Sequence, residues 1–237
     1  QLIVSILIIF SPLIIIFRIV KNKEDKYRFI EKFSIHSKKR NNGNLIWFHG
    51  ASVGEILSII PLIKYYERKK SVKQILITSS TLSSSRVIKK FKFKKTIHQF
   101  YPIDHFLLTN KFLEYWKPTV AIFIDSEIWP NMFTKINKKN IPLVLLNARI
   151  THKTFKRWIK IKNYSTSVFD KISIAFPQNI ETKFFLRKLN TNKINLIGNL
   201  KFAENNDENL SKISKKLKYE FNKKSIWVAS STHAQEE

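Results

Sequence analysis

The first residue that could do chemistry is a carboxylate placed where a short apolar run gives way to a helical pattern. Glu55 closes the segment Ser52-Val53-Gly54-Glu55, and Gly50 and Gly54 in this loop are two of the chain's four glycines. The pattern S-x-x-E is typical of a capping box, in which Ser52 caps a helix and Glu55 reaches back to the Ser52 N–H. The alternative interpretation is a general base, held ionised by the positive end of the helix.

Polar side chains also follow the other apolar runs, and they could act together with Glu55. In chain order the clusters are His49-Gly50-Ala51-Ser52, Ser80-Thr81, Asp125-Ser126-Glu127, Asn147-Ala148-Arg149, Pro177-Gln178-Asn179, Gly198-Asn199-Leu200-Lys201 and Ser230-Ser231-Thr232-His233. Parallel pairing of the runs would bring the clusters to one edge of a sheet. The sequence therefore predicts a substrate cleft for a polyhydroxylated or phosphorylated molecule.

The elements that must position these residues alternate between strand and helix. Strands are predicted at Leu45–His49, Gln74–Ser79, Val120–Ile124, Pro142–Leu146, Lys171–Ala175, Lys193–Ile197 and Ser225–Ala229, with a weaker one near Ile97–Tyr101. Helical segments include Ser84–Phe91, His105–Trp116 and Ile180–Leu189. This alternation is typical of an α/β fold, with a parallel sheet covered by helices on both faces.

Several common enzyme signatures are absent from the sequence. It contains no G-x-G-x-x-G after a strand, no Walker A loop and no G-x-S-x-G elbow, which weighs against a dinucleotide fold, a P-loop NTPase and an α/β-hydrolase. The chain has no cysteine, so a disulfide scaffold and a thiol nucleophile are excluded. The histidines show no metal-ligand spacing, and we expect no metal site.

The chain is strongly basic, with 43 Lys and Arg residues against 17 Asp and Glu residues and a formal net charge of +26. Such an excess is typical of proteins that bind nucleic acid, an anionic membrane or a phosphorylated ligand. The lysines are scattered along the whole chain rather than gathered in a patch, so the charge carries little weight. We expect an anionic membrane surface and no nucleic acid as partner; a basic membrane- or nucleic-acid-binding module is an alternative.

The first residues favour a membrane anchor. Residues 2–17 are almost uninterrupted apolar sequence; Ile19 and Val20 extend this run toward the ~20 residues that span a bilayer, and Arg18 can snorkel. The basic residues that follow predict a cytoplasmic location for the rest of the chain. A buried core helix is the alternative. Residues 21–44 are a basic connector that either lies on lipid headgroups or is a plain linker.

Four segments together resemble the 3-deoxy-D-manno-octulosonic acid (Kdo) transferases of Gram-negative bacteria. They are His49-Gly50-Ala51-Ser52-Val53-Gly54-Glu55, Asp125-Ser126-Glu127-Ile128-Trp129-Pro130-Asn131, Asn147-Ala148-Arg149 and Gly198-Asn199-Leu200-Lys201-Phe202. The segment from Trp227 to His233 is similar to that family's entry into its second domain, and the apolar start with its basic flank is similar too. The segments follow in the family's order over nearly the whole chain.

The resemblance implies an inverting glycosyltransferase with the GT-B architecture of two Rossmann-like domains. Members of the family transfer Kdo from CMP-Kdo to the lipid A precursor, lipid IVA, in lipopolysaccharide core biosynthesis. The N-terminal domain would bind lipid IVA and the C-terminal domain CMP-Kdo, without a metal or other cofactor. The resemblance also implies a location at the inner membrane, with the catalytic domain on the cytoplasmic face. Another GT-B sugar-nucleotide enzyme is the alternative.

Carried over to this chain, the resemblance makes Glu55 the general base, while Asp125 and Lys201 stabilise the transition state. The family has Glu where this chain has Asp125, which is one methylene shorter, so either the backbone adjusts or Glu127 takes part. Arg149 would pair with an acceptor phosphate or form a salt bridge inside its loop. The residues expected to bind substrate are Ser52, Gly54, Glu127, Asn147 and Arg149.

The expected organisation has five parts. These are a membrane anchor (1–20), a basic juxtamembrane linker (21–44), a Rossmann-like acceptor-binding domain (45–203), an interdomain connector (204–224) and the start of a donor domain (225–237). Because the chain stops just after a strand-like run, we expect most of the donor half to be missing from it. The 237 residues alone are therefore expected to transfer no Kdo.

Overall fold

The structure is a computed structural model that describes residues 11, 14–200 and 221. Residues 1–204 form one compact unit and residues 205–237 a second, and the fold described below belongs to the first. Its described elements are η1 (Phe29–Phe33), β1 (Leu45–His49), α2 (Val53–Ser58), α3 (Ile60–Glu67), β2 (Gln74–Ser79), α4 (Leu82–Lys90), β3 (Thr96–Phe100), α5 (Phe106–Trp116), β4 (Val120–Ile124), α6 (Pro130–Lys138), β5 (Leu143–Ala148), α7 (His152–Lys160), α8 (Lys162–Phe169), β6 (Ile174–Pro177) and α9 (Ile180–Lys188).

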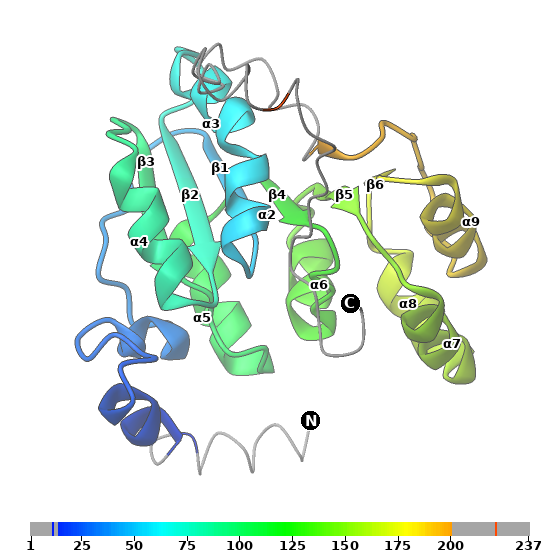
Figure 1. Ribbon diagram of the computed structural model, residues 1–237, viewed down its shortest axis with the longest axis horizontal. Helices are drawn as coiled ribbons and strands as arrows, with labels where there is room; N and C mark the ends of the chain where they lie inside the picture. Colours follow the sequence, from blue (N-terminus) through cyan, green and yellow to red (C-terminus); the bar gives the residue numbers. More distant parts are fainter. Residues whose placement is uncertain (1–10, 12–13, 201–220, 222–237) are drawn as a thin grey trace. The chain divides into compact units, whose positions relative to one another are not determined.

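The strands of the described residues form one parallel sheet in the order β3-β2-β1-β4-β5-β6 (Figure 1). The predicted α/β fold with a parallel sheet is therefore confirmed. The order of the strands reverses between β1 and β4, and open α/β sheets bind ligands beyond the strand ends at such a point. His49, the last residue of β1, lies opposite Thr78 of β2 and Phe123 of β4.

Alternate residues of each strand enter two separate hydrophobic clusters, one on each face of the sheet. Leu45 and Trp47 of β1 belong to the cluster that α5, α6, α8 and α9 cover. Ile46 and Phe48 belong to the cluster under α2, α3 and α4. Figure 1 shows helices on both faces of the sheet. Because both faces are covered, β1 is buried throughout and β4 from Ala121 onward, as their continuous apolar sequence predicts.

The predicted strands differ from the observed ones at the C-terminal side of the sheet. Strands β1, β2 and β4 have the predicted bounds. Strand β6 begins at Ile174 rather than at Lys171, because the Ile172 N–H bonds to Phe169 O and closes the end of α8. A strand at Lys193–Ile197 is wrong: only Ile194 forms a bridge, to Ala175, before the chain leaves the sheet. The predicted strand Ser225–Ala229 lies outside the described residues.

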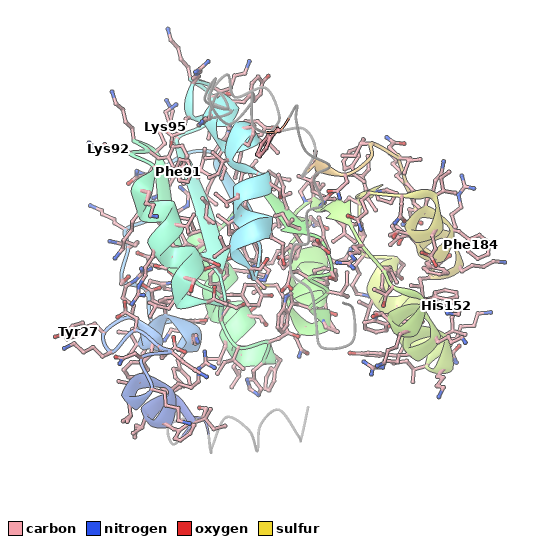
Figure 2. All side chains as sticks on the ribbon, viewed as in Figure 1. Tyr27, Phe91, Lys92, Lys95, His152 and Phe184 are labelled. Atoms are coloured by element: carbon pink, nitrogen blue, oxygen red, sulfur yellow. The ribbon has the colours of Figure 1, made fainter. Side chains whose placement is uncertain are left out.

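Helix α7 packs on the domain without burying any residue. Phe155 stacks on Phe185 of α9 with ring centroids 4.2 Å apart, and Trp158 meets Phe169 edge-on at 5.3 Å. Figure 2 shows His152 of α7 and Phe184 of α9 on this side of the domain, and both are exposed. Phe155 and Trp158 thus pack the helix against the core, and its basic residues are exposed.

The N-terminal part of the description begins with helical residues 14–20, in which Ile16, Phe17 and Val20 are exposed. Among residues 11, 14–200 and 221, no helix combines the length and the apolar character needed to cross a bilayer. The anchor expected over residues 1–20 falls largely on residues outside this description.

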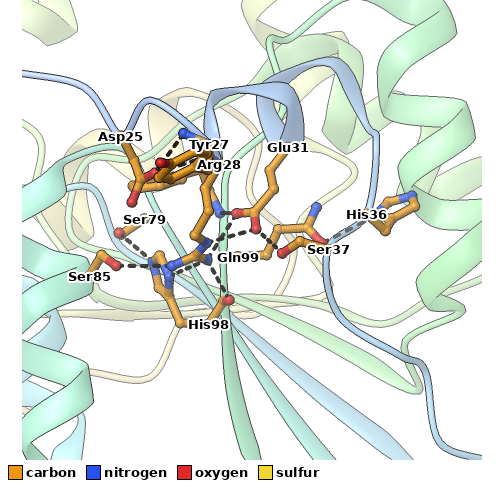
Figure 3. A network of polar contacts seen from close by, with 11 residues as sticks. Asp25, Tyr27, Arg28, Glu31, His36, Ser37, Ser79, Ser85, His98 and Gln99 are labelled. Carbon is orange, nitrogen blue, oxygen red and sulfur yellow. Dashed lines mark hydrogen bonds and ion pairs between the residues drawn. The ribbon is translucent and has the colours of Figure 1, made fainter. Parts of the chain in front are cut away.

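A buried ionic network ties the segment after this helix to the edge of the sheet (Figure 3). The Glu31 side chain has no exposed surface, and it accepts hydrogen bonds from Arg28 Nε and Nη2, both at 2.9 Å. It also accepts the Phe100 N–H at 2.7 Å and the hydroxyl of Ser37. Since Phe100 ends β3, one carboxylate joins η1 to the sheet.

His98 completes the network on the side of β3. Its Nε2 lies 2.8 Å from Ser79 Oγ, and Arg28 Nη2 donates to the His98 carbonyl at 2.8 Å. Burial, helped by the positive charges of Arg28, Lys89 and Lys38, lowers the pKa of His98 to about 3. The ring is therefore neutral at physiological pH, and the charge of Glu31 is balanced by Arg28 alone within this network.

Removing the charge of Glu31 should destabilise the fold strongly. In Glu31→Gln, Arg28 loses its buried counter-charge, and breaking a buried pair in this way costs about 3 kcal/mol. The free energy of unfolding in urea measures the loss. Glu114→Gln is the matched control, because the ion pair of Glu114 with Lys139 is exposed and long, at 3.9 Å. This substitution should change stability by less than about 1 kcal/mol. Equal losses in the two variants would contradict the role given to Glu31.

Candidate functional site

Glu55 is the third residue of α2, and its carboxylate folds back over the loop that precedes the helix. Oε2 accepts the Ala51 N–H at 2.8 Å and Oε1 accepts the Ser52 hydroxyl at 2.8 Å, while Ser52 Oγ accepts the Glu55 N–H at 3.3 Å. Ser52 therefore caps the helix as predicted, but Glu55 reaches the Ala51 N–H instead of the Ser52 N–H. A carboxylate has further lone pairs, so capping leaves room for a proton-accepting role.

The pKa of the Glu55 carboxyl lies above its ordinary value. Burial is the largest cause, and the negative charges of Glu127 and Asp125 act in the same direction; the hydrogen bonds from Ser52 and Ala51 oppose them only in part. The sequence suggested that a positive helix end would hold this group ionised. Helix α2 has only six residues, and burial outweighs its effect. A raised pKa suits a general base that works near neutral pH.

Gly50 provides the space that the Glu55 side chain occupies. A Cβ at Gly50 would lie 3.1 Å from Glu55 Cβ, 3.3 Å from Ile56 Cδ1 and 3.4 Å from Glu55 Oε2. The second glycine of the loop differs, because a Cβ at Gly54 would meet nothing within 4 Å. The missing side chain at Gly50 thus lets the carboxylate approach the loop, whereas Gly54 is not needed for space.

Asp125 forms the turn that follows β4. Its φ of 61° is in the left-handed region, which Asp adopts more readily than most residues. Its N–H donates to Leu146 O at 3.0 Å, and its carbonyl accepts the Arg149 N–H at 3.2 Å. The Ser126 hydroxyl donates to its carboxylate at 3.1 Å. Asp125 therefore binds the end of β4 to the end of β5 and is itself buried.

Glu127 stands two residues further on and is held by two ring nitrogens. Its Oε2 lies 3.1 Å from Nε2 of His49 and accepts the Trp129 indole N–H at 2.9 Å. The His49 side chain is completely buried, whereas that of Glu127 keeps 16% of its surface exposed. One oxygen of Glu127 is thus shared by the two rings.

Aromatic packing fixes the His49 ring. The ring stacks on Tyr101 with centroids 3.8 Å apart, and Tyr101 also packs against Trp129 at 5.1 Å. Burial, with smaller contributions from Asp104 and Glu127, raises the pKa of the Tyr101 hydroxyl well above its usual range. That hydroxyl is buried without a hydrogen-bond partner among the described residues. Tyr101 therefore acts in this site as a neutral, apolar platform.

Asp104 sets the start of helix α6 and with it the position of Trp129. Its carboxylate accepts the Asn131 N–H at 3.1 Å and the Met132 N–H at 2.8 Å, and its carbonyl accepts the Asn131 side-chain amide at 2.6 Å. Pro130 begins the helix, where its missing N–H costs nothing. Burial raises the pKa of Asp104 even though these bonds oppose it.

Asn147 draws the G-N-L-K segment to the same edge of the sheet. It has a φ of 52° and is buried, and its Oδ1 accepts the Leu200 N–H at 3.0 Å. Its Nδ2 has no partner within residues 14–200. Lys201, the next residue after Leu200, lies outside the described residues, so its expected position is not established. The side chain of Arg149 is exposed, and the loop salt bridge suggested for it is not seen in the described part of the chain.

The structure thus gathers most of the predicted residues at one edge. Glu55, Asp125 and Glu127 interact electrostatically, and Ser52 is bonded to Glu55. Sequence reasoning missed Asp104 and the bonds that His49 and Trp129 make to Glu127. Asp104 follows β3 as the other polar clusters follow their strands, so extending the same rule to the weaker strand would have found it.

A family model described as 3-deoxy-D-manno-octulosonic-acid transferase (kdotransferase) matches residues 26–204. The chain belongs to this family. The matched residues contain β1 through α9, and therefore all of the site described above.

Curated relatives agree with this assignment. The chain is 36% identical to a probable mitochondrial 3-deoxy-D-manno-octulosonic acid transferase of Arabidopsis thaliana, over 96% of the chain and 53% of the relative. Transferases of Rickettsia bellii and Haemophilus influenzae are 34% and 30% identical, over 94% and 97% of the chain and 53% and 55% of the relatives. The chain thus spans about half the length of the curated relatives it matches.

A solved structure supports the fold. UDP-GlcNAc 2-epimerase from Neisseria meningitidis, bound to UDP-GlcNAc, matches with a TM-score of 0.51 and 13% identity, over 76% of this chain and 54% of that chain. At this identity the likeness concerns the fold alone, and it agrees with the Rossmann-like sheet predicted for the chain.

The two glycines of the β1–α2 loop should respond oppositely to alanine. Gly50→Ala should destabilise the fold by about 1–3 kcal/mol, the usual cost of overpacking, because its methyl group must displace Glu55 or Ile56. Gly54→Ala should stabilise it by about 0.5–1 kcal/mol, since Ala favours the helix and meets no neighbour. Urea denaturation measures both. A stable Gly50→Ala variant would refute the close approach of Glu55.

Proposed function

We propose that this chain provides the acceptor-binding half of an enzyme that transfers Kdo from CMP-Kdo to lipid IVA, the lipid A precursor. Family membership supports Kdo transfer in general, and the choice of donor and acceptor is our extension of it. The observation that carries the proposal is the half-buried carboxylate of Glu55, with its raised pKa, beside the switch point of the sheet.

In the proposed reaction Glu55 accepts the proton of an acceptor hydroxyl. The hydroxyl oxygen attacks the anomeric carbon of Kdo while the bond from that carbon to the phosphate oxygen breaks, and CMP leaves with the bonding electrons. This single displacement inverts the anomeric centre. Positive charge develops on the sugar, and a carboxylate at the end of β4, Asp125 or Glu127, stabilises it. Lys201 would stabilise the negative charge of the leaving phosphate, and the proposal requires no metal or other cofactor.

The remaining expected residues take part in binding. Ser52 orients Glu55 through its hydroxyl, Gly54 leaves the loop open to the acceptor, and Asn147 holds the segment that leads to Lys201. The exposed side chain of Arg149 is available to an acceptor phosphate.

We further propose that the protein works at the inner membrane, with its catalytic domain on the cytoplasmic face. The exposed apolar residues Ile16, Phe17 and Val20, followed by a run of basic residues from Lys21, support contact with an anionic bilayer.

Replacing Glu55 by Gln tests the general base. The amide keeps the shape of the side chain but cannot take a proton, so kcat for Kdo transfer by the complete protein should fall roughly a hundredfold or more. A residue that only caps α2 would instead cost about 1 kcal/mol of stability and leave kcat unchanged. Transfer from CMP-Kdo to lipid IVA and urea denaturation, measured on the same preparations, separate the two roles.

The pH dependence gives an independent measurement. Because the base must be ionised, kcat/KM should fall on the acid side with a midpoint above the ordinary glutamate pKa of 4.5. A carboxyl whose pKa is raised by folding destabilises the folded state once it ionises. Stability should therefore decrease as pH rises from the ordinary pKa through the raised one, and Glu55→Gln should flatten that decrease. An acid limb at or below 4.5 would contradict the assignment.

A further inference from the structure

A continuous line of hydrogen bonds runs from the core of the sheet to Glu127. Trp47 and His49 are two residues apart on β1 and point to the same face. The Trp47 indole N–H donates to Thr78 Oγ1 at 2.9 Å, and the same oxygen lies 3.0 Å from His49 Nδ1. The other ring nitrogen of His49 lies 3.1 Å from Glu127 Oε2. Thr78 is directly opposite His49 in the β1–β2 register.

The Trp47 indole N–H, at the buried end of this chain of hydrogen bonds, determines which atom donates in each of the following bonds. An indole nitrogen can only donate, so Thr78 Oγ1 must accept from Trp47 and has one hydrogen left to give. His49 Nδ1 is the nearer acceptor at 3.0 Å, against 3.4 Å for Phe48 O. Nδ1 also lies 3.2 Å from the Thr78 carbonyl oxygen, which can only accept. The two ring nitrogens therefore each face an acceptor, the Thr78 carbonyl at Nδ1 and the Glu127 carboxylate at Nε2, and the hydroxyl hydrogen of Thr78 favours Nδ1 as the nitrogen without the proton. If Nδ1 accepts, the proton of the neutral ring is on Nε2, where it points at Glu127.

Glu127 receives this N–H on the oxygen that already accepts from Trp129. Both rings are held by their surroundings, because His49 is fully buried and stacked on Tyr101, and Trp129 directly precedes helix α6, whose start is bonded to Asp104. The carboxylate is thus held at one oxygen, and the other makes no hydrogen bond within residues 14–200. It also acts on Glu55 more strongly than Asp125 does.

Asp125 is engaged in a different way. Its backbone joins β4 to β5, its φ is left-handed, and its carboxylate accepts from the neighbouring Ser126. It is only 5% exposed. Asp125 is therefore largely closed to solvent, whereas the Glu127 side chain is both held and partly open to it.

We propose that His49 is a positioning residue, fixed as the Nε2–H tautomer by Trp47 and Thr78, and that it holds Glu127 as the carboxylate that stabilises positive charge on the sugar. This rests on the proposed function and names Glu127, not Asp125, as the group that faces the anomeric carbon. Neither His49 nor Trp47 touches the substrate.

Two substitutions of His49 separate positioning from bulk. The amide nitrogen of Gln comes close to the place of Nε2 and can still donate to Glu127, whereas that of Asn comes close to the place of Nδ1 and cannot. In the complete protein His49→Gln should keep kcat within about threefold, and His49→Asn should lose about tenfold to a hundredfold, with little change in KM, since a displacement of about 1 Å can cost up to ~10²-fold. Equal kcat values in the two variants would overturn the inference.

His98 offers a matched control for these variants. It is a buried histidine of the same sheet whose Nε2 bonds to Ser79 rather than to a carboxylate. His98→Asn and His98→Gln should both lower the midpoint of urea denaturation without separating in kcat. If the His98 pair showed the same split in kcat as the His49 pair, general loosening of the sheet would explain both.

The two carboxylates are compared directly by Glu127→Gln and Asp125→Asn. We expect the larger loss of kcat, about a hundredfold, in Glu127→Gln; a larger loss in Asp125→Asn would return the role to Asp125. Wild-type protein that transfers no Kdo would instead contradict the proposed function itself, whatever the variants do.

Imidazole ¹⁵N shifts decide the tautomer without any assay of activity. The His49 signals, identified by their loss in His49→Gln, should show a protonated Nε2 and an unprotonated Nδ1 at neutral pH. Thr78→Val, which keeps the side-chain volume but removes the hydroxyl, should weaken that preference, and Thr109→Val, at a buried threonine that bonds to His105 O, should not. A proton on Nδ1 in the wild-type protein would overturn the proposed chain of bonds.

Discussion

Strands β1 and β4 pair in parallel from Ile46 to His49 and from Val120 to Phe123, although residues 50–119 of the chain separate them. Because the strand order reverses at this pair, the loop after β1 leads to helices on one face of the sheet and the loop after β4 to helices on the other, and open α/β sheets bind their ligands at such a point. Glu55 comes from one loop and Glu127 from the other. The pairing of β1 with β4 is therefore what brings the two carboxylates close enough to interact.

The carboxylates at this edge of the sheet are partly buried, which is unfavourable for a charged group, and hydrogen bonds from nitrogen atoms compensate for the burial. Glu55 and Asp104 are each bonded to backbone N–H groups, and Glu127 is bonded to two ring nitrogens. At strand β3, Glu31 likewise accepts a backbone N–H, from Phe100, and it is also paired with Arg28. Burial and, to a smaller extent, the charges of Glu127 and Asp125 raise the pKa of Glu55. Glu55 is the group assigned to proton transfer.

Most strands could be predicted from the sequence, because short continuous apolar runs bounded by polar turns are typical of buried strands, as at Leu45–His49 and Val120–Ile124. The run Lys193–Ile197 contains three apolar residues but also Lys193 and Asn195, and it forms a bridge only at Ile194. Local sequence also marked Glu55 and Ser52 as a pair. It could not show that Glu127 lies against His49, because that contact depends on how β1 and β4 are paired in three dimensions. Lys201 is outside the described residues.

Glu24 links the N-terminal helical residues to the segment that contacts the sheet. Glu24 is bonded to Arg18 on the helical residues before it and to Lys32 in η1 after it, and η1 is fastened to β3 through Glu31. The chain between helical residues 14–20 and the sheet is therefore fixed at both ends by charged side chains. The helical residues 14–20 are thus linked to the sheet through ion pairs and hydrogen bonds as well as through the chain.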